Sequence, residues 1–127
     1  MKITVCPCGS NKPYTDCCGR YLDGKATPAT AEALMRSRYT AYTLQREDYL
    51  LATWHSSTQP VQPIVTNEEN SKWLGLQVKR HEQQDESHAL VEFVARYKVG
   101  GRANRLHEVS RFVREDGRWF YVDGDMV

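Results

Sequence analysis

Residues 6–19 read CPCGSNKPYTDCCG and contain every cysteine of the chain: Cys6, Cys8, Cys17 and Cys18. A disulfide-rich secreted domain would spread its cysteines along the chain, whereas four thiols in one short loop indicate a metal site. Four sulfur ligands without a redox demand favour Zn²⁺ in tetrahedral geometry. Because four cysteines close the coordination shell, the predicted zinc is structural and not catalytic. A redox-active dithiol and a cysteine cluster without a ligand are the alternatives.

The residues between the two cysteine pairs suit a tight loop around an ion. Gly9 and Gly19 can adopt positive φ and turn backbone amides toward the sulfurs. Asn11 tolerates the left-handed region better than most residues, and Tyr14 is expected to cover the metal. Four thiolates around Zn²⁺ keep a net negative charge, which nearby basic residues would partly offset. These basic residues are Lys2, Lys12 and Arg20.

The composition fits one ordinary folded domain with a small appendage. The chain has 127 residues, of which 40% are hydrophobic and 26% charged, and its formal net charge is +1. This near-neutral balance gives no overall electrostatic reason to bind nucleic acid or an anionic membrane. Residues 1–6 do not resemble a secretory signal, and no apolar run approaches the roughly 18 residues that span a bilayer. We therefore expect a bacterial-type cytoplasmic protein without a membrane partner.

Helical periodicity follows a short linker at residues 23–26. Thr27 is expected to cap a helix with Pro28 in its first turn, and apolar side chains then recur every three or four residues to about Leu44. A second short helix is expected over residues 48–54, with its apolar side chains facing inward. A further helical turn is expected at residues 67–72.

After residue 73 the period of the pattern changes to two, which predicts strands. Leu74, Leu76 and Val78 are expected to share one face of the first strand. Gly100-Gly101 ends the second strand, and Asp116-Gly117 is a strong signal for a hairpin turn before the last one. The expected strands cover residues 74–79, 89–99, 105–114 and 119–123.

Helices followed by an antiparallel meander predict an α+β fold, in which one helix layer packs on a curved sheet. We expect two units, a zinc knuckle at residues 1–24 and an α+β domain at residues 27–127. The larger unit supplies its own apolar faces, so it should fold without the knuckle. Metal removal should then unravel only about the first 20 residues.

The cysteine loop closely resembles the SEC-C motif, a small zinc knuckle with the pattern C-P-C-G-S-G-x-x-[YF]-x-x-C-[CH]-G. The resemblance implies that all four cysteines ligate zinc. The chain departs from the pattern at Asn11, where glycine is usual, and at Thr15 and Asp16, where lysines are common. The loss of basic residues weakens the case for a knuckle that binds the ribosome or nucleic acid.

The rest of the chain resembles the cone-shaped nuclear-transport-factor-2-like fold, and more specifically the middle domain of the YchJ-type family of uncharacterised bacterial proteins. The strings that carry this resemblance are ALMRSRYTAY (33–42), DYLLATWH (48–55), HEVSRF (107–112) and DGRWFYVDG (116–124). The resemblance implies a curved sheet and a long helix around a pocket. Many family members carry a second, C-terminal cysteine knuckle, and no such knuckle occurs before Val127.

Strand alternation groups polar and aromatic side chains on one face of the strand over residues 105–114. With a two-residue turn, Ser110 would lie opposite Asp123, and Phe112 opposite Tyr121. A face with aromatic walls and convergent polar groups is typical of a ligand pocket. The candidate pocket residues are Glu108, Ser110, Phe112, Tyr121, Asp123, Tyr39 and Trp54.

A structural role for the same residues is the alternative. Glu108 could form a buried ion pair with Arg36 or Arg38 that joins helix to sheet, and aromatic side chains at these spacings are usually core. His107 points to the opposite face from Glu108, because neighbours on a strand alternate, so the two residues cannot share one substrate.

Three functions are compatible with these features. The first is a non-catalytic adaptor that binds another protein through the zinc knuckle. The second is a small-molecule binder or enzyme that uses the cone pocket, with Glu108 as acid or base. The third is a nucleic-acid or ribosome contact through the knuckle, which the neutral net charge disfavours.

Overall fold

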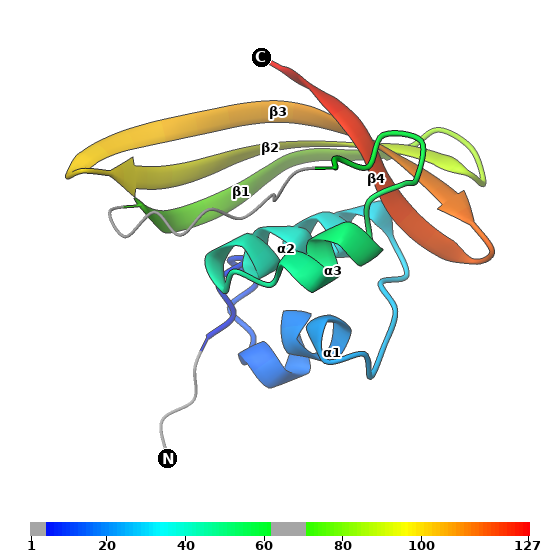
Figure 1. The fold of residues 1–127 in the computed structure, drawn as a ribbon, viewed down its shortest axis with the longest axis horizontal. Helices are drawn as coiled ribbons and strands as arrows, with labels where there is room; N and C mark the ends of the chain where they lie inside the picture. Colours follow the sequence, from blue (N-terminus) through cyan, green and yellow to red (C-terminus); the bar gives the residue numbers. More distant parts are fainter. Residues whose placement is uncertain (1–4, 62–70) are drawn as a thin grey trace.

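The chain folds as an antiparallel sheet covered on its inner face by helices, with the cysteine loop on the far side of those helices (Figure 1). The computed structural model describes residues 5–61 and 71–127. The predicted α+β class and the order of helices before strands are confirmed. The elements are a 3₁₀ turn Tyr14–Asp16, α1 Cys18–Leu22, α2 Ala31–Thr43, α3 Glu47–Ala52, β1 Ser71–Gln83, β2 His88–Val99, β3 Arg102–Glu115 and β4 Arg118–Met126.

The four strands form one antiparallel meander in the order β1-β2-β3-β4. Asp116 and Gly117 both have positive φ, 52° and 78°, as the predicted two-residue turn requires. Gly100 and Gly101, which form the turn between β2 and β3, also have positive φ, 55° and 83°. Of the helical turn predicted at residues 67–72, residues 67–70 lie outside the described residues, and the last two positions belong to β1.

Helix α2 begins later than the sequence pattern predicts. Its N-cap is Thr30, whose side-chain oxygen accepts a 3.0 Å hydrogen bond from the amide of Ala33, so the expected cap at Thr27 is wrong. The residue before the cap contacts the sheet, because the carbonyl oxygen of Ala29 accepts a hydrogen bond from the Trp119 indole on β4. The N-terminus of α2 is thereby tied to the last strand of the sheet.

A bulge in β1 changes which side chains reach the inner face of the sheet. In β1 the register shifts between Trp73 and Gly75, so Leu74 is the extra residue and is 49% exposed. Trp73 takes the inner position expected for Leu74 and contacts Tyr39 and Tyr42 of α2. The prediction that Leu74 shares a face with Leu76 and Val78 is therefore wrong.

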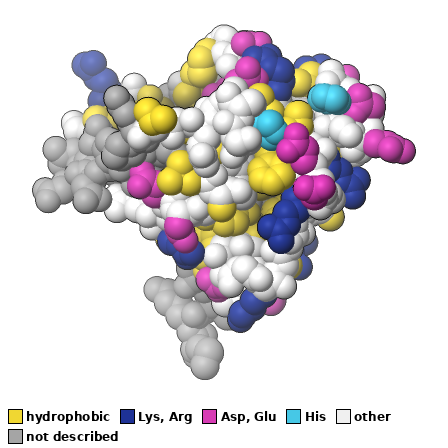
Figure 2. Space-filling view, turned by 45° about the vertical axis from the view of Figure 1, so that its right-hand side comes forward, with side chains coloured by type: hydrophobic (Ala, Val, Ile, Leu, Met, Phe, Trp, Pro, Cys, Tyr) yellow, Lys and Arg dark blue, Asp and Glu magenta, His cyan; other side chains and the backbone are white. Residues whose placement is uncertain are grey.

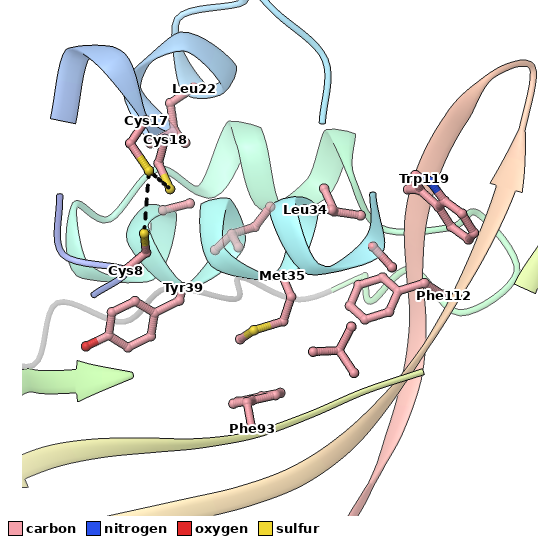
Figure 3. Close-up of a cluster of buried hydrophobic side chains, with 14 of the residues drawn as sticks. Cys8, Cys17, Cys18, Leu22, Leu34, Met35, Tyr39, Phe93, Phe112 and Trp119 are labelled. Atoms are coloured by element: carbon pink, nitrogen blue, oxygen red, sulfur yellow. Dashed lines mark hydrogen bonds between the residues drawn. The ribbon is translucent and has the colours of Figure 1, made fainter. Parts of the chain in front are cut away.

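One continuous core joins the cysteine loop to the sheet through α2. Figure 3 shows α2 between the cysteines on one side and Phe93 on the other, with Met35 projecting toward the sheet. The backbone oxygen of Leu22 at the end of α1 accepts a hydrogen bond from Arg46, which also connects the knuckle to the helices. The division of the chain into two separately folding units stays a prediction, but the two share a packed interface.

Candidate functional site

The four cysteines form a compact cluster in the interior of the molecule. Their sulfur atoms all lie within 4.8 Å of one another, and all four residues are buried. The Cys8 and Cys17 sulfurs are 3.6 Å apart, and those of Cys17 and Cys18 are 3.9 Å apart. These separations are far longer than a disulfide bond.

The donor set fits a tetrahedral metal ion. Zinc–sulfur bonds of about 2.3 Å place neighbouring sulfurs of a tetrahedron roughly 3.8 Å apart, close to the two separations given above. Hydrogen bonds from the thiols of Cys18 and Cys8 lower the pKa of Cys6, whereas hydrogen bonds with Cys6 and Cys8 raise the pKa of Cys18. The four residues can therefore hold one metal ion.

Local backbone geometry shapes the loop around this cluster. Gly9 has the predicted positive φ, 84°, and Asn11 lies in the left-handed region at φ 66°. The positive φ expected for Gly19 is wrong, because this residue belongs to α1 and its φ is not positive. A Cβ atom there would lie 2.7 Å from the carbonyl oxygen of Tyr14 and 2.8 Å from its ring, so close approach requires the glycine.

The polar groups nearest the cysteines come partly from α2, which the sequence did not indicate. The Arg36 guanidinium donates a 2.7 Å hydrogen bond to the Cys8 carbonyl oxygen, and the Thr40 hydroxyl lies 3.7 Å from the Cys6 sulfur. Ser10, within the loop, places its hydroxyl 3.1 Å from the Cys17 sulfur. Of the basic residues expected to offset charge, Arg20 instead donates to the Cys17 carbonyl oxygen. Lys2 lies outside the described residues.

A second feature is a cavity of about 300 Å³ between α2 and the inner face of the sheet, which we call the cone pocket. Its walls are mostly aromatic and aliphatic, and a few polar groups point into it. The lining residues are Met35, Arg38, Tyr39, Tyr42, Trp73, Phe93, Ala95, Leu106, Glu108, Ser110, Phe112 and Tyr121.

Glu108 lies on the inner face of β3 and is held by two hydroxyl groups. Ser110 donates to its Oε2 atom at 2.5 Å, and the Tyr121 hydroxyl donates to the same atom at 3.4 Å. Gly124 of β4 makes room for this carboxylate, since a Cβ atom there would lie 2.7 Å from the Glu108 Cδ atom. The carboxylate is therefore fixed by β3 and β4 together.

Arg38 is the buried cation of the pocket. Its Nη1 atom donates to the Leu50 carbonyl oxygen at 2.8 Å and to the Thr53 hydroxyl at 2.7 Å. Its guanidinium carbon lies 5.0 Å from the Trp54 ring centroid and 4.6 Å from that of Tyr121. Burial lowers the pKa of Arg38, whereas these ring faces favour the cation.

The proposed ion pair between helix and sheet does not form among the described residues. Arg36 pairs with Glu32 and Arg38 bonds to α3 and the residue after it, so neither bridges to Glu108 within 4 Å. Arg38 was missed as a pocket residue because its position on α2 gave no more signal than that of Arg36. Only the packing of α3 and β4 places it in the cavity.

Five of the seven predicted pocket residues line the cavity, and two do not. Phe112 lies opposite Tyr121 as predicted, but a bulge between Arg111 and Phe112 shifts the register beyond that point. Asp123 consequently pairs with Arg111 and not with Ser110, and its carboxylate accepts a 2.5 Å hydrogen bond from Arg111 on the outer face. Trp54 does not line the cavity, and its ring packs edge-on against the ring of Tyr121, which does.

The phenol groups of the pocket stay protonated well above neutral pH. Burial raises the pKa of Tyr39 to about 12, and it also raises the pKa values of Tyr42 and Tyr121. These hydroxyls can therefore donate hydrogen bonds to a ligand. His107 lies on the opposite face from Glu108, as alternation predicts, and contacts Glu92 at 2.7 Å.

Comparisons with known proteins agree with this architecture. Residues 30–124 match the family model described as the YchJ middle NTF2-like domain, and residues 5–20 match the SEC-C motif. A UPF0225 protein from Cupriavidus metallidurans is 61% identical, over 95% of this chain and 88% of its own length. Within the described residues, no helix is both long and apolar enough to cross a bilayer.

Solved structures of SEC-C motif containing proteins show the same fold. The solution structure of the protein from Rhodopseudomonas palustris has a TM-score of 0.88 and 38% identity, and covers 98% of this chain and 99% of that one. The crystal structure of the protein from Psychrobacter arcticus has a TM-score of 0.83 and 31% identity, covering 95% and 81%.

Proposed function

Because this chain belongs to the UPF0225 family, with a YchJ-type middle domain and a SEC-C motif, we propose that it is a small-molecule-binding protein with a structural zinc. The observation that carries the proposal is the cone pocket, in which Arg38 and Glu108 face an aromatic-walled cavity of about 300 Å³. A volume of this size is at the lower end of the range for small-molecule sites.

The lining chemistry defines the class of ligand. Six aromatic rings favour a flat, mainly apolar body, and polar atoms gather where Glu108, Ser110 and Tyr121 meet. The ligand's polar end would donate to the Glu108 carboxylate or accept from the tyrosine hydroxyls. Binding is better supported than catalysis, because the described residues that line the cavity include no histidine to exchange protons with Glu108.

The proposed metal is zinc, held by all four cysteines of the loop. Four sulfurs at tetrahedral spacing suit Zn²⁺, and a closed shell without an open position makes the ion structural. In that role it supplies folding energy to a loop that is too short to have its own core. Elemental analysis of protein purified without added metal should give about one zinc per chain, whereas a disulfide among these cysteines would contradict the proposal.

A pocket-filling variant tests the binding function. Ala95 lines the cavity, so Ala95→Leu should occupy it, whereas Ala103→Leu on the exposed end of β3 should not. We expect a fluorinated library of phenols, aromatic amides and aromatic amines to give hits with the wild type and Ala103→Leu, and none with Ala95→Leu. Hits that persist in a folded Ala95→Leu variant would place binding outside the cone pocket.

The adaptor function stays a prediction. It would use the exposed side of the cysteine loop, where Lys12 and Asp16 reach solvent. An affinity pull-down with the wild type and a Cys17→Ser, Cys18→Ser variant tests it. A partner captured equally by the wild type and by the variant would not bind through the knuckle, and this result would contradict the adaptor function.

A further inference from the structure

One end of the sheet is strongly basic, although the net charge of the whole chain is close to zero. Residues 93–107 contain four Lys or Arg side chains and no Asp or Glu, and they form the β2–β3 hairpin end of the sheet. Lys72 of β1 lies beside them. The face seen in Figure 2 is different, because acidic and basic side chains are intermixed there.

Like charges lie directly opposite one another on this end of the sheet. Arg96 of β2 pairs in register with Arg105 of β3, and Lys72 of β1 pairs with Lys98 of β2. Like charges directly opposite each other on a sheet destabilise the fold. Two such pairs, two residues apart along β2, are a local cost in stability, which indicates that the charges have a use outside the fold.

The four cations of these two pairs point away from the pocket and into solvent. Ala95 and Leu106 line the cavity, so the side chains that follow or precede them on β2 and β3, Arg96 and Arg105, face outward. All four are exposed, and none forms an ion pair with any residue in the ranges 5–61 and 71–127. We call Lys72, Arg96, Lys98 and Arg105 the basic patch.

Protection of a sheet edge does not explain the patch. Basic side chains often guard unpaired edge strands against aggregation, and β3 is such an edge here, because its paired residues with β4 run only from Glu108 to Glu115. This would account for Arg105. Arg96 and Lys98, however, lie on β2, which is paired on both sides, so they guard no edge.

We propose that the basic patch binds the phosphate backbone of a nucleic-acid duplex. Along β2 the two cations are about 6.6 Å apart, and across the strands the pairs are roughly 5 Å apart, which gives a regular grid of positive charge. Such a grid complements a regular polyanion. Trp73 and Tyr97, aromatic residues near this end, contact each other on the inner face, and the His107 ring on the outer face contacts Glu92. Within the described residues, this arrangement does not favour the stacking of single-stranded bases.

The duplex contact would be electrostatic and without sequence preference, since backbone contacts carry no base information. It differs from the knuckle contact considered from the sequence, because it uses the opposite side of the molecule. It is also independent of the proposed small-molecule function, since the patch and the cone pocket lie on opposite faces of the sheet.

Fluorescence anisotropy with short labelled RNA and DNA duplexes tests the proposal between about 50 and 200 mM salt. We expect log K to fall with log salt at a slope of about −3 to −4, from roughly 0.9 per phosphate contact for up to four cations. The double variant Arg96→Gln, Arg105→Gln should reduce the magnitude of this slope by about 2 and weaken binding at low salt at least about tenfold. Its melting temperature should not fall, because a like-charge pair is removed.

The matched control is Arg114→Gln, Arg118→Gln, which removes two exposed arginines at the other end of the sheet. This variant should bind duplexes as the wild type does. Equal losses in both double variants, or no duplex binding at low salt, would overturn the proposal. Tighter binding to a poly-glutamate peptide or to phosphatidylserine vesicles than to either duplex would also overturn it, and would assign the patch to an acidic protein or a membrane.

Discussion

The side chain of Arg36 donates a 2.7 Å hydrogen bond to the main-chain oxygen of Cys8 and so joins helix α2 to the cysteine loop. The opposite side of the same helix carries Met35, Arg38 and Tyr39, which line the cone pocket. Figure 3 shows this arrangement, with the cysteines and the sheet on either side of α2. The candidate metal centre and the candidate pocket therefore share one helix, and a change at either should reach the other.

Arg36→Ala should weaken the metal site without removing a ligand. The substitution leaves the Cys8 carbonyl oxygen without its charged donor, a loss of about 1–3 kcal/mol in the free energy of unfolding. We also expect faster release of the proposed zinc to a chelator. Glu32→Gln is the control, because it removes the ion pair of Arg36 within α2, worth about 0.5 kcal/mol or less, and a 3.9 Å contact with His81, but leaves the Cys8 contact in place. Equal effects of the two variants would show that the Cys8 contact contributes nothing.

Metal removal should loosen the cysteine loop and also weaken ligand binding in the pocket. The cysteines belong to the same core as Leu34 and Met35, so the loss of the ion removes support from one side of α2. We expect a lower melting temperature but a remaining cooperative transition, because the contacts between α2 and the sheet do not involve the loop. Calorimetry with and without chelator measures both. A chain that starts at Lys25 and shows no cooperative unfolding would contradict separate folding of the larger unit.

Glu108→Gln should be neutral or stabilising. The structure gives Glu108 two hydroxyl donors and no ion pair within the described residues, so the amide loses no salt bridge. A carboxylate kept for a ligand is often held at a cost to the fold. A thermal melt of this variant measures the effect. A fall of more than about 1 kcal/mol in the free energy of unfolding would instead favour a structural role for Glu108.

Gly124→Ala should displace the Glu108 carboxylate. The new Cβ atom would lie 2.7–2.9 Å from the Glu108 Cδ and Cγ atoms, and such crowding costs typically 1–3 kcal/mol. The loss should largely vanish in a Glu108→Ala background, which a double-mutant cycle measures. Gly75→Ala is the control, because a Cβ atom there meets nothing within 4 Å. Additive losses from Gly124→Ala and Glu108→Ala would contradict the contact.

The sequence predicted elements better than it predicted register. Alternation in β2 and β3 and the Asp116-Gly117 turn were sufficient to place Glu108, Ser110 and Phe112 on the inner face. The positions of Leu74 and Asp123 were wrong for a common reason, because a bulge adds one residue to the alternation. Leu74 is that extra residue in β1, and Asp123 comes directly after the bulge in β4. A bulge depends on contacts between strands, and a single strand's pattern does not contain that information.

The metal ligands were predictable, but their surroundings were not. Four cysteines in one loop can be found by spacing alone, whereas Arg36 and Thr40 approach them from α2, more than 20 residues away. Arg38 became a pocket residue only through α3 and β4, which enclose its guanidinium group. Local spacing thus identified the four metal ligands and five of the pocket residues, whereas Arg36, Thr40 and Arg38 reach the two sites only through tertiary packing.

The stability of the protein should fall steeply above pH 10. Burial raises the pKa of Tyr39 and of Tyr49 to about 12, whereas an unfolded tyrosine has a pKa near 10. Between these values the unfolded chain has lost the protons that the folded chain keeps, so a rise in pH favours unfolding. The stabilisation is fully present below about pH 10, and each tyrosine contributes a loss of up to about 1.4 kcal/mol per pH unit above it.

Urea unfolding at several values between about pH 9 and 11.5 measures this dependence. Tyr39→Phe should reduce the slope of the free energy of unfolding against pH by about 1.4 kcal/mol per unit, because one late-titrating phenol is removed. Tyr21→Phe is the control, since that hydroxyl contacts Arg20 at the surface. If both variants keep the wild-type slope, the Tyr39 phenol is not protected by burial, and the wall of the cone pocket must be open to water at this position.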